Sequence, residues 1–130
     1  MGSLKTSYLV ATGVYCAAIF WLSQQSELPL PENDAFTFPG IDKLAHCFMY
    51  GGLAALLSKG IRESNDPAKP WVQWFVPVGF AILYGLSDEV HQLYVRQRDF
   101  EWLDLVADGA GATLAQLGLY RLWRKPGAGP

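Results

Sequence analysis

Residues 41–57, IDKLAHCFMYGGLAALL, place four polar side chains at the start of an otherwise apolar run. Lys43, His46 and Tyr50 are separated by three and then four residues, so they share one face of a helix. Asp42 lies four residues before His46, on an adjoining line of the same helix. The stretch therefore predicts an apolar helix whose N-terminal end carries a polar face.

Three further apolar runs accompany this one, at residues 8–22, 71–94 and 102–123. A membrane-spanning helix needs about 20 residues, and the runs reach that length only when their polar ends are included. The first run is therefore expected to extend back to about residue 4. The sequence predicts an all-α fold, an integral membrane bundle of four transmembrane helices. A single domain over residues 1–125 is expected, followed by a short C-terminal tail at residues 126–130.

The composition supports a membrane protein and leaves one alternative. The chain is 51% hydrophobic and 17% charged, whereas a typical soluble domain is about 25% charged. A soluble helical bundle remains the competing interpretation. The formal charge of -2 gives no indication of nucleic-acid binding, which usually requires a basic patch. Cys16 and Cys47 lie in apolar runs outside any CxxC or CxxH spacing, so no disulfide or zinc site is inferred from them.

The basic residues predict the orientation. If both termini are cytoplasmic, residues 60–69 form an inner loop, and residues 23–40 and 95–101 form outer loops. Seven of the ten basic residues then face the cytoplasm, as the positive-inside rule favours. We therefore expect a multipass protein of the cell membrane with both termini in the cytoplasm.

This orientation brings three helix ends to the outer side. Glu89 and Gln92 close the third helix, Asp104 and Asp108 open the fourth, and Arg98 lies in the loop between them. A charge inside a membrane is costly unless it is paired or hydrated, so these groups should converge in one pocket. The expected ion pairs are Arg98 with Asp104 or Glu89, and Lys43 with Asp108. The candidate ligand-binding residues are Asp42, Lys43, His46, Tyr50, Glu89, Gln92, Arg98, Asp104 and Asp108.

Two stretches resemble the VanZ-like family. Residues 42–57, DKLAHCFMYGGLAALL, are similar to its pattern of Asp-Lys, then His, then Tyr. Residues 84–118, YGLSDEVHQLYVRQRDFEWLDLVADGAGATLAQLG, are similar to its second half, with Glu, Gln, Arg and Asp before a Gly-rich helix. The resemblance covers residues 42–120 and carries the same nine candidate positions. This chain departs from the pattern at Arg96-Gln97, where the family usually has Pro-Gly, and at Asp108, which is often Asn.

The resemblance implies a multipass membrane protein, and the family's name comes from a protein linked to resistance to the glycopeptide antibiotic teicoplanin. The first functional hypothesis is binding, with or without modification, of an anionic lipid or lipid-linked cell-envelope precursor. Lys43 and Arg98 would hold a phosphate or carboxylate, helped by two helix N-termini, while His46 and Glu89 could exchange protons. No nucleophile–base pair is evident, so the sequence leaves open whether the protein is an enzyme.

The second hypothesis is a non-enzymatic membrane interaction protein in which the polar residues are a structural core. A proton or ion relay is a further alternative. His46, His91 and the nearby acids show no familiar metal-binding spacing, so neither a metal nor a cofactor is expected.

Overall fold

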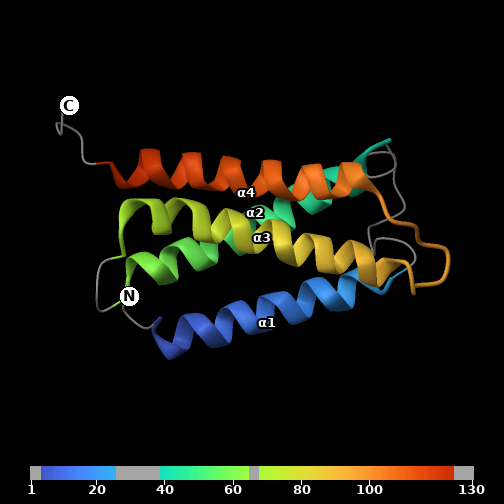
Figure 1. Cartoon of the computed structure of the whole chain (residues 1–130), viewed down its shortest axis with the longest axis horizontal. Coiled ribbons are helices and arrows are strands. Elements are labelled where there is room, and N and C mark those ends of the chain that lie inside the picture. Colours follow the sequence, from blue (N-terminus) through green and yellow to red (C-terminus); the bar gives the residue numbers. More distant parts are fainter. Residues whose placement is uncertain (1–3, 26–38, 65–67, 125–130) are drawn as a thin grey trace.

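The computed structural model describes residues 4–25, 39–64 and 68–124, and within them it contains four α-helices and no strand. The predicted all-α fold is thus confirmed. The predicted C-terminal tail and most of the predicted loop at residues 23–40 lie outside the described residues. The helices, shown in Figure 1, are α1 (Thr6–Ser23), α2 (Ile41–Arg62), α3 (Pro70–Gln92) and α4 (Trp102–Trp123).

Helix α2 continues five residues past the predicted end at Leu57. Tertiary packing explains the extension, because Ile61 is buried together with Leu57 and with Val72 of α3. These contacts hold the last turns in place although Gly60, a poor helix former, interrupts them. With this extension α2 has 22 residues, and a membrane-spanning helix needs about 20.

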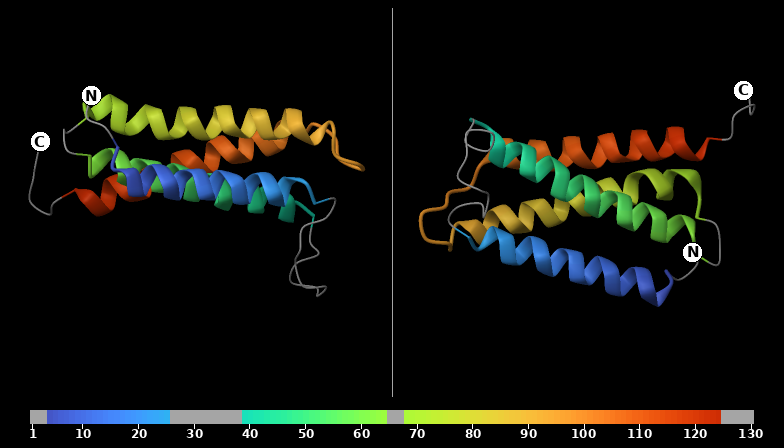
Figure 2. Two further views of the ribbon diagram at one scale, coloured as in Figure 1. Left: turned by 90° about the horizontal axis from the view of Figure 1, so that it is seen from below. Right: turned by 180° about the vertical axis from the view of Figure 1, so that it is seen from behind.

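The four helices lie side by side with their long axes roughly aligned (Figures 1 and 2). Helix α2 contacts each of the other three, and α4 is its main partner. Helix α1 lies at the edge of the bundle and buries only Ile19 and Ser23. The central core combines Ile19 and Tyr50 with small residues such as Ala54, Ala81 and Ala112, which allow the helices to approach closely.

Gly111 marks the closest approach of α2 and α4. A Cβ placed on Gly111 would lie 2.7 Å from the carbonyl carbon of Cys47 and 2.8 Å from its Cα. A Cβ on Gly51 would in turn lie 3.0 Å from the carbonyl oxygen of Gly111. The absence of a side chain at Gly111 therefore permits the close approach of the two helices.

The outer surface of the bundle is rich in large apolar side chains. Phe48 is 73% exposed and Leu83 is 69% exposed, and such a surface on a single chain is typical of a protein that contacts lipid or a partner. Among the described residues, α1 and α2 are long and apolar enough to span a membrane. That α3 and α4 also span it remains a prediction.

The start of α1 and the end of α4 lie at the same end of the bundle (Figure 1). This arrangement is the one required if both chain ends face one side of a membrane. It does not distinguish the two sides, so the cytoplasmic placement of both termini stays a prediction from the basic residues.

Cysteine labelling tests that orientation. In a variant with Cys16 and Cys47 replaced by alanine, we expect Ser64→Cys to be shielded from a membrane-impermeant thiol reagent in intact cells. Asp99→Cys, in the loop between α3 and α4, should react under the same conditions. Both sites should react after the cells are opened. Labelling of Ser64→Cys but not of Asp99→Cys in intact cells would reverse the assigned orientation.

Candidate functional site

Helices α2 and α4 begin, and α3 ends, at one end of the bundle (Figure 1). Polar side chains from these helices and from the loop between α3 and α4 meet there. Helix α2 runs opposite to α3, and α3 runs opposite to α4, which brings these ends to one level. We call this set the polar cluster; it contains the nine candidate residues and two more, Asp88 and Glu101. Six of the candidates are buried, namely His46, Tyr50, Glu89, Gln92, Asp104 and Asp108, and Asp42, Lys43 and Arg98 are half-buried.

Lys43 lies at the rim of the polar cluster among three acids. Its Nζ is 2.6 Å from Asp42 Oδ2 and 3.0 Å from Asp104 Oδ1, and it also contacts Glu101. The predicted pair of Lys43 with Asp108 is wrong. Asp108 lies one helical turn beyond Asp104, about 6 Å further into the bundle, which is the level of His46 rather than of Lys43.

His46 and Asp108 form the buried centre of the cluster. His46 Nδ1 is 2.8 Å from Asp108 Oδ1, and with Asp108 ionised the Nδ1–H donates this bond. The other ring nitrogen, Nε2, lies 3.6 Å from Asp104 Oδ2. Tyr50 stacks on the imidazole with ring centroids 5.9 Å apart. The ring is therefore held from one side and from its edge, and its Nε2 is directed at the acids.

Arg98 is bound by an amide instead of a carboxylate. Its Nε and Nη2 donate to Gln92 Oε1 at 3.3 and 3.0 Å. The predicted pairing of Arg98 with Asp104 or Glu89 is wrong, because no ion pair among the described residues involves Arg98. Glu89 is engaged elsewhere, since its Oε2 accepts a hydrogen bond of 2.9 Å from the backbone N–H of Glu101.

Asp88 and Glu101 are members of the cluster that the candidate set does not contain. Asp88 is only 4% exposed, and its Oδ2 has no hydrogen-bond partner. Its position four residues before Gln92 places both on one face of α3, and this spacing is a signal that could have found it. Glu101 precedes α4, and nothing in its local sequence shows that it reaches Lys43.

Acids outnumber bases in the polar cluster. Six carboxyl groups lie near two permanent cations, Lys43 and Arg98, and one histidine, His46. Each of His46, Glu89 and Asp104 offers a ligand atom within 4.8 Å of the others, so these three could hold a metal ion. A second set, Asp42, Glu101 and Asp104, meets the same criterion, but the ammonium of Lys43 contacts all three of its members.

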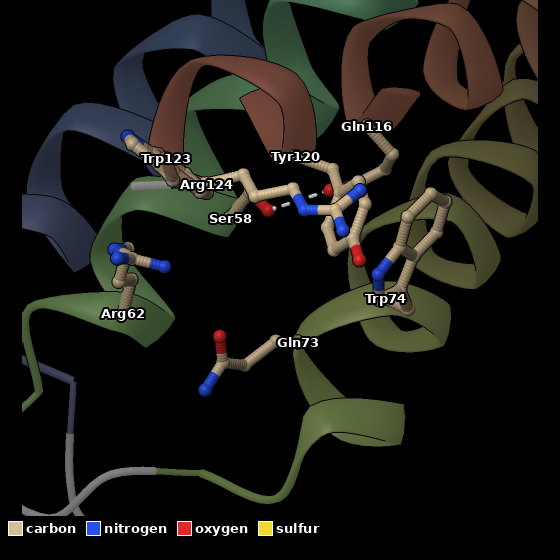
Figure 3. Close-up of a pocket in the computed structure, with 8 residues that line it drawn as sticks. All are labelled: Ser58, Arg62, Gln73, Trp74, Gln116, Tyr120, Trp123 and Arg124. Carbon is tan, nitrogen blue, oxygen red and sulfur yellow. Dashed lines mark hydrogen bonds between the residues drawn. The ribbon is translucent and has the colours of Figure 1, made fainter. Parts of the chain in front are cut away.

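The cavities differ in size at the two ends of the bundle. Beside Arg98 and His46 lies a space of about 10 Å³, enough for about one water molecule. The larger cavity, about 130 Å³, lies at the opposite end and contains no candidate residue. Figure 3 shows it between Arg62, Trp74 and Arg124, beside the 2.9 Å hydrogen bond from Ser58 to Gln116. Among the described residues, the space beside the polar cluster is thus much smaller than the cavity at the opposite end.

The comparisons with known proteins agree with the resemblance seen in the sequence. A family model described as VanZ/LLP1 matches residues 6–124, which include all four helices and the whole polar cluster. No curated protein and no solved structure matches the chain.

Proposed function

The chain belongs to the VanZ/LLP1 family, and on that premise we propose that its polar cluster binds the phosphate of an anionic lipid or lipid-linked cell-envelope precursor. In this proposal all four helices cross the cell membrane, both termini are cytoplasmic, and the polar cluster faces the outer leaflet. The family's name links it to teicoplanin resistance, and a ligand from the cell envelope would be consistent with that link.

The observation that carries the proposal is that Arg98 forms no ion pair among the described residues. Arg98 is half-buried in the polar cluster, and its hydrogen-bond partner among the described residues is the neutral amide oxygen of Gln92. A guanidinium has five N–H donors in a planar fork suited to phosphate, and two of its nitrogens are engaged here. The positive charge of Arg98 therefore remains available to an anion.

Two helix ends add to the positive potential at this level. Gly40 and Glu101, the N-cap residues of α2 and α4, make no capping hydrogen bond with a side chain of their own, although the N–H of Glu101 donates to Glu89. Unsatisfied N–H groups at a helix N-terminus favour anions. The six acids oppose this effect, so the phosphate is placed at the Arg98 side of the cluster and not among the acids around Lys43.

Replacing Arg98 tests the proposal. We expect Arg98→Gln to weaken binding of phosphatidylglycerol and of undecaprenyl phosphate at least about 10-fold, because a hydrogen bond to a charged group contributes about 1.5–3 kcal/mol. Binding to the full chain would be measured in detergent micelles by native mass spectrometry, with phosphatidylcholine as the zwitterionic comparison.

Arg96→Gln is the matched control, since Arg96 is exposed in the same loop and the change in charge is identical. It should leave lipid binding within about twofold of the parent, because exposed charges contribute little. Equal losses in both variants would indicate a general electrostatic effect, and no loss in Arg98→Gln would remove the ligand assignment.

The alternative function is that of a non-enzymatic membrane interaction protein with the polar cluster as its structural core. The small volume of about 10 Å³ beside the cluster favours it, as do the links of Lys43 and His46 from α2 to α4. Single replacements distinguish the two functions. A structural core predicts that Arg98→Gln lowers the folded fraction, whereas a ligand site predicts a folded protein that has lost lipid binding.

A further inference from the structure

We propose that His46, Glu89 and Asp104 form a binding site for a divalent transition-metal cation, with Zn²⁺ and Mn²⁺ as the fitting ions. The three side chains come from α2, α3 and α4, and no two of them are neighbours in the sequence. This explains why spacing along the chain gave no indication of a metal and why none was expected. The cation site depends on the positions of these three side chains and not on lipid binding.

The three side chains are already close to a ligating arrangement. Their ligand atoms all lie within 4.8 Å of one another, and His46 Nε2 is 3.6 Å from Asp104 Oδ2. Bonds from zinc to nitrogen or oxygen are about 2.0–2.2 Å, so two ligands of one ion stand at most about 4.4 Å apart. Small side-chain rotations are therefore sufficient to close the set around an ion.

The hydrogen bond on the far side of the imidazole is the one that metal-ligating histidines make. His46 Nδ1 bonds to Asp108 Oδ1 at 2.8 Å, and Asp108 is fully buried. A carboxylate that accepts from one ring nitrogen fixes the orientation of the ring and raises the basicity of the other nitrogen. That other nitrogen, Nε2, is the atom that faces Asp104.

Glu89 gives a second and independent indication of a missing ligand. Its side chain is 0% exposed, and Oε2 is fixed by the backbone N–H of Glu101. The remaining oxygen, Oε1, is buried and has no hydrogen-bond partner. A buried carboxylate oxygen without a partner is costly, and a bound cation would satisfy it.

The excess of buried acids in the cluster also favours a bound cation. Asp88, Glu89, Asp104 and Asp108 are buried acids, and His46 is the one buried base among the described residues of the cluster. Lys43 contributes one positive charge from the rim, where it also contacts Asp42 and Glu101. A divalent cation would offset two of the remaining negative charges.

The donor set decides the class of ion. One imidazole and two carboxylates suit Zn²⁺ and Mn²⁺, whereas Ca²⁺ and Mg²⁺ prefer sets made only of oxygen. Three protein ligands leave at least one coordination position open, as in catalytic zinc sites. A phosphate oxygen at that position would explain how an acid-rich cluster accepts an anion; this last step alone rests on the proposed function.

Direct binding measurements test the cation site. The full chain, purified in detergent and stripped with a chelator, should bind one Zn²⁺ or Mn²⁺ per chain in calorimetric titrations with ZnCl₂ and MnCl₂. His46→Gln and Glu89→Gln should each weaken the affinity at least 10-fold, and Asp108→Asn, which acts through His46, about 10-fold. Asp99→Asn, an exposed acid in the nearby loop, is the matched control and should bind as the parent does.

The absorption spectrum of bound Co²⁺, measured together with circular dichroism, distinguishes loss of the cation site from loss of folding. Co²⁺ added to the parent should give visible absorption bands of a nitrogen–oxygen ligand set, and these should be absent in His46→Gln, whose circular dichroism should still match the parent. Absence of stoichiometric binding in the parent, or equal binding in His46→Gln and Glu89→Gln, would overturn the cation site. His46 would then be an ion-pair partner of Asp108 only.

The bridge to phosphate is tested separately. If the cation links the cluster to phosphate, chelation should reduce binding of undecaprenyl phosphate to the parent, and soluble inorganic phosphate should compete only weakly because it lacks the lipid tail. Undiminished lipid binding after chelation would refute the bridge and leave the metal titration unaffected. If Arg98→Gln binds both metal and lipid as the parent does, the proposed function is refuted and the cation site is supported.

Discussion

Gly111→Leu is expected to destabilise the protein by about 3 kcal/mol or more, because the new side chain has no space between α2 and α4. Already a Cβ at this position would meet the carbonyl group and the Cα of Cys47. These are backbone atoms inside α2, so they cannot move aside as the end of a flexible side chain can. The helices would have to separate, which would also disturb the contact at Gly51 and the burial of Ala112.

The matched control is Gly118→Leu on the same helix. Gly118 is exposed, and a Cβ there would meet no atom within 4 Å. We expect its unfolding temperature in detergent to stay near that of the parent, whereas Gly111→Leu should unfold at a clearly lower temperature or fail to elute as a single species. Identical unfolding curves for the two variants would contradict the close packing of α2 on α4.

Gly85→Ala is expected to disrupt the polar cluster by displacing the side chain of Asp108. The added Cβ would lie 3.0 Å from Asp108 Cγ and closer still to Oδ2. Asp108 is fully buried and bonded to His46, so it cannot rotate away without losing that bond. Loss of a charge-assisted hydrogen bond costs about 1.5–3 kcal/mol, which exceeds the gain of about 1 kcal/mol that alanine brings to a helix interior.

Gly79→Ala, also in α3, is the matched control. It brings the same gain in helix propensity without a contact to Asp108. No atom lies within 4 Å of a Cβ at Gly79, so this variant should be as stable as the parent or slightly more stable. Thermal unfolding and Zn²⁺ titration of both variants provide the measurement. In Gly85→Ala we expect lower stability and weaker Zn²⁺ binding, since the ring of His46 loses its support. Equal stability of Gly85→Ala and Gly79→Ala would show that Asp108 can move freely.

The four helices, and the level at which the polar residues gather, could be predicted from the amino-acid sequence. A helix satisfies its backbone hydrogen bonds locally, so apolar runs broken by Pro39 and Pro70 are sufficient to delimit α2 and α3. Successive helices that run in opposite directions bring the start of α2, the end of α3 and the start of α4 together. Gly111 could likewise be recognised, because small residues recur along α4 at helical spacing.

Which of these groups contact one another follows from the packing of the helices and not from the sequence pattern. Pairing depends on the rotation of each helix about its axis and on its depth relative to its neighbours, and one turn of α4 separates Asp104, which meets Lys43, from Asp108, which meets His46. The partner of Arg98 depends on the conformation of the loop between α3 and α4, which brings its guanidinium to Gln92. Neither rotation nor depth is encoded in local spacing, because both result from close packing between residues far apart in the chain.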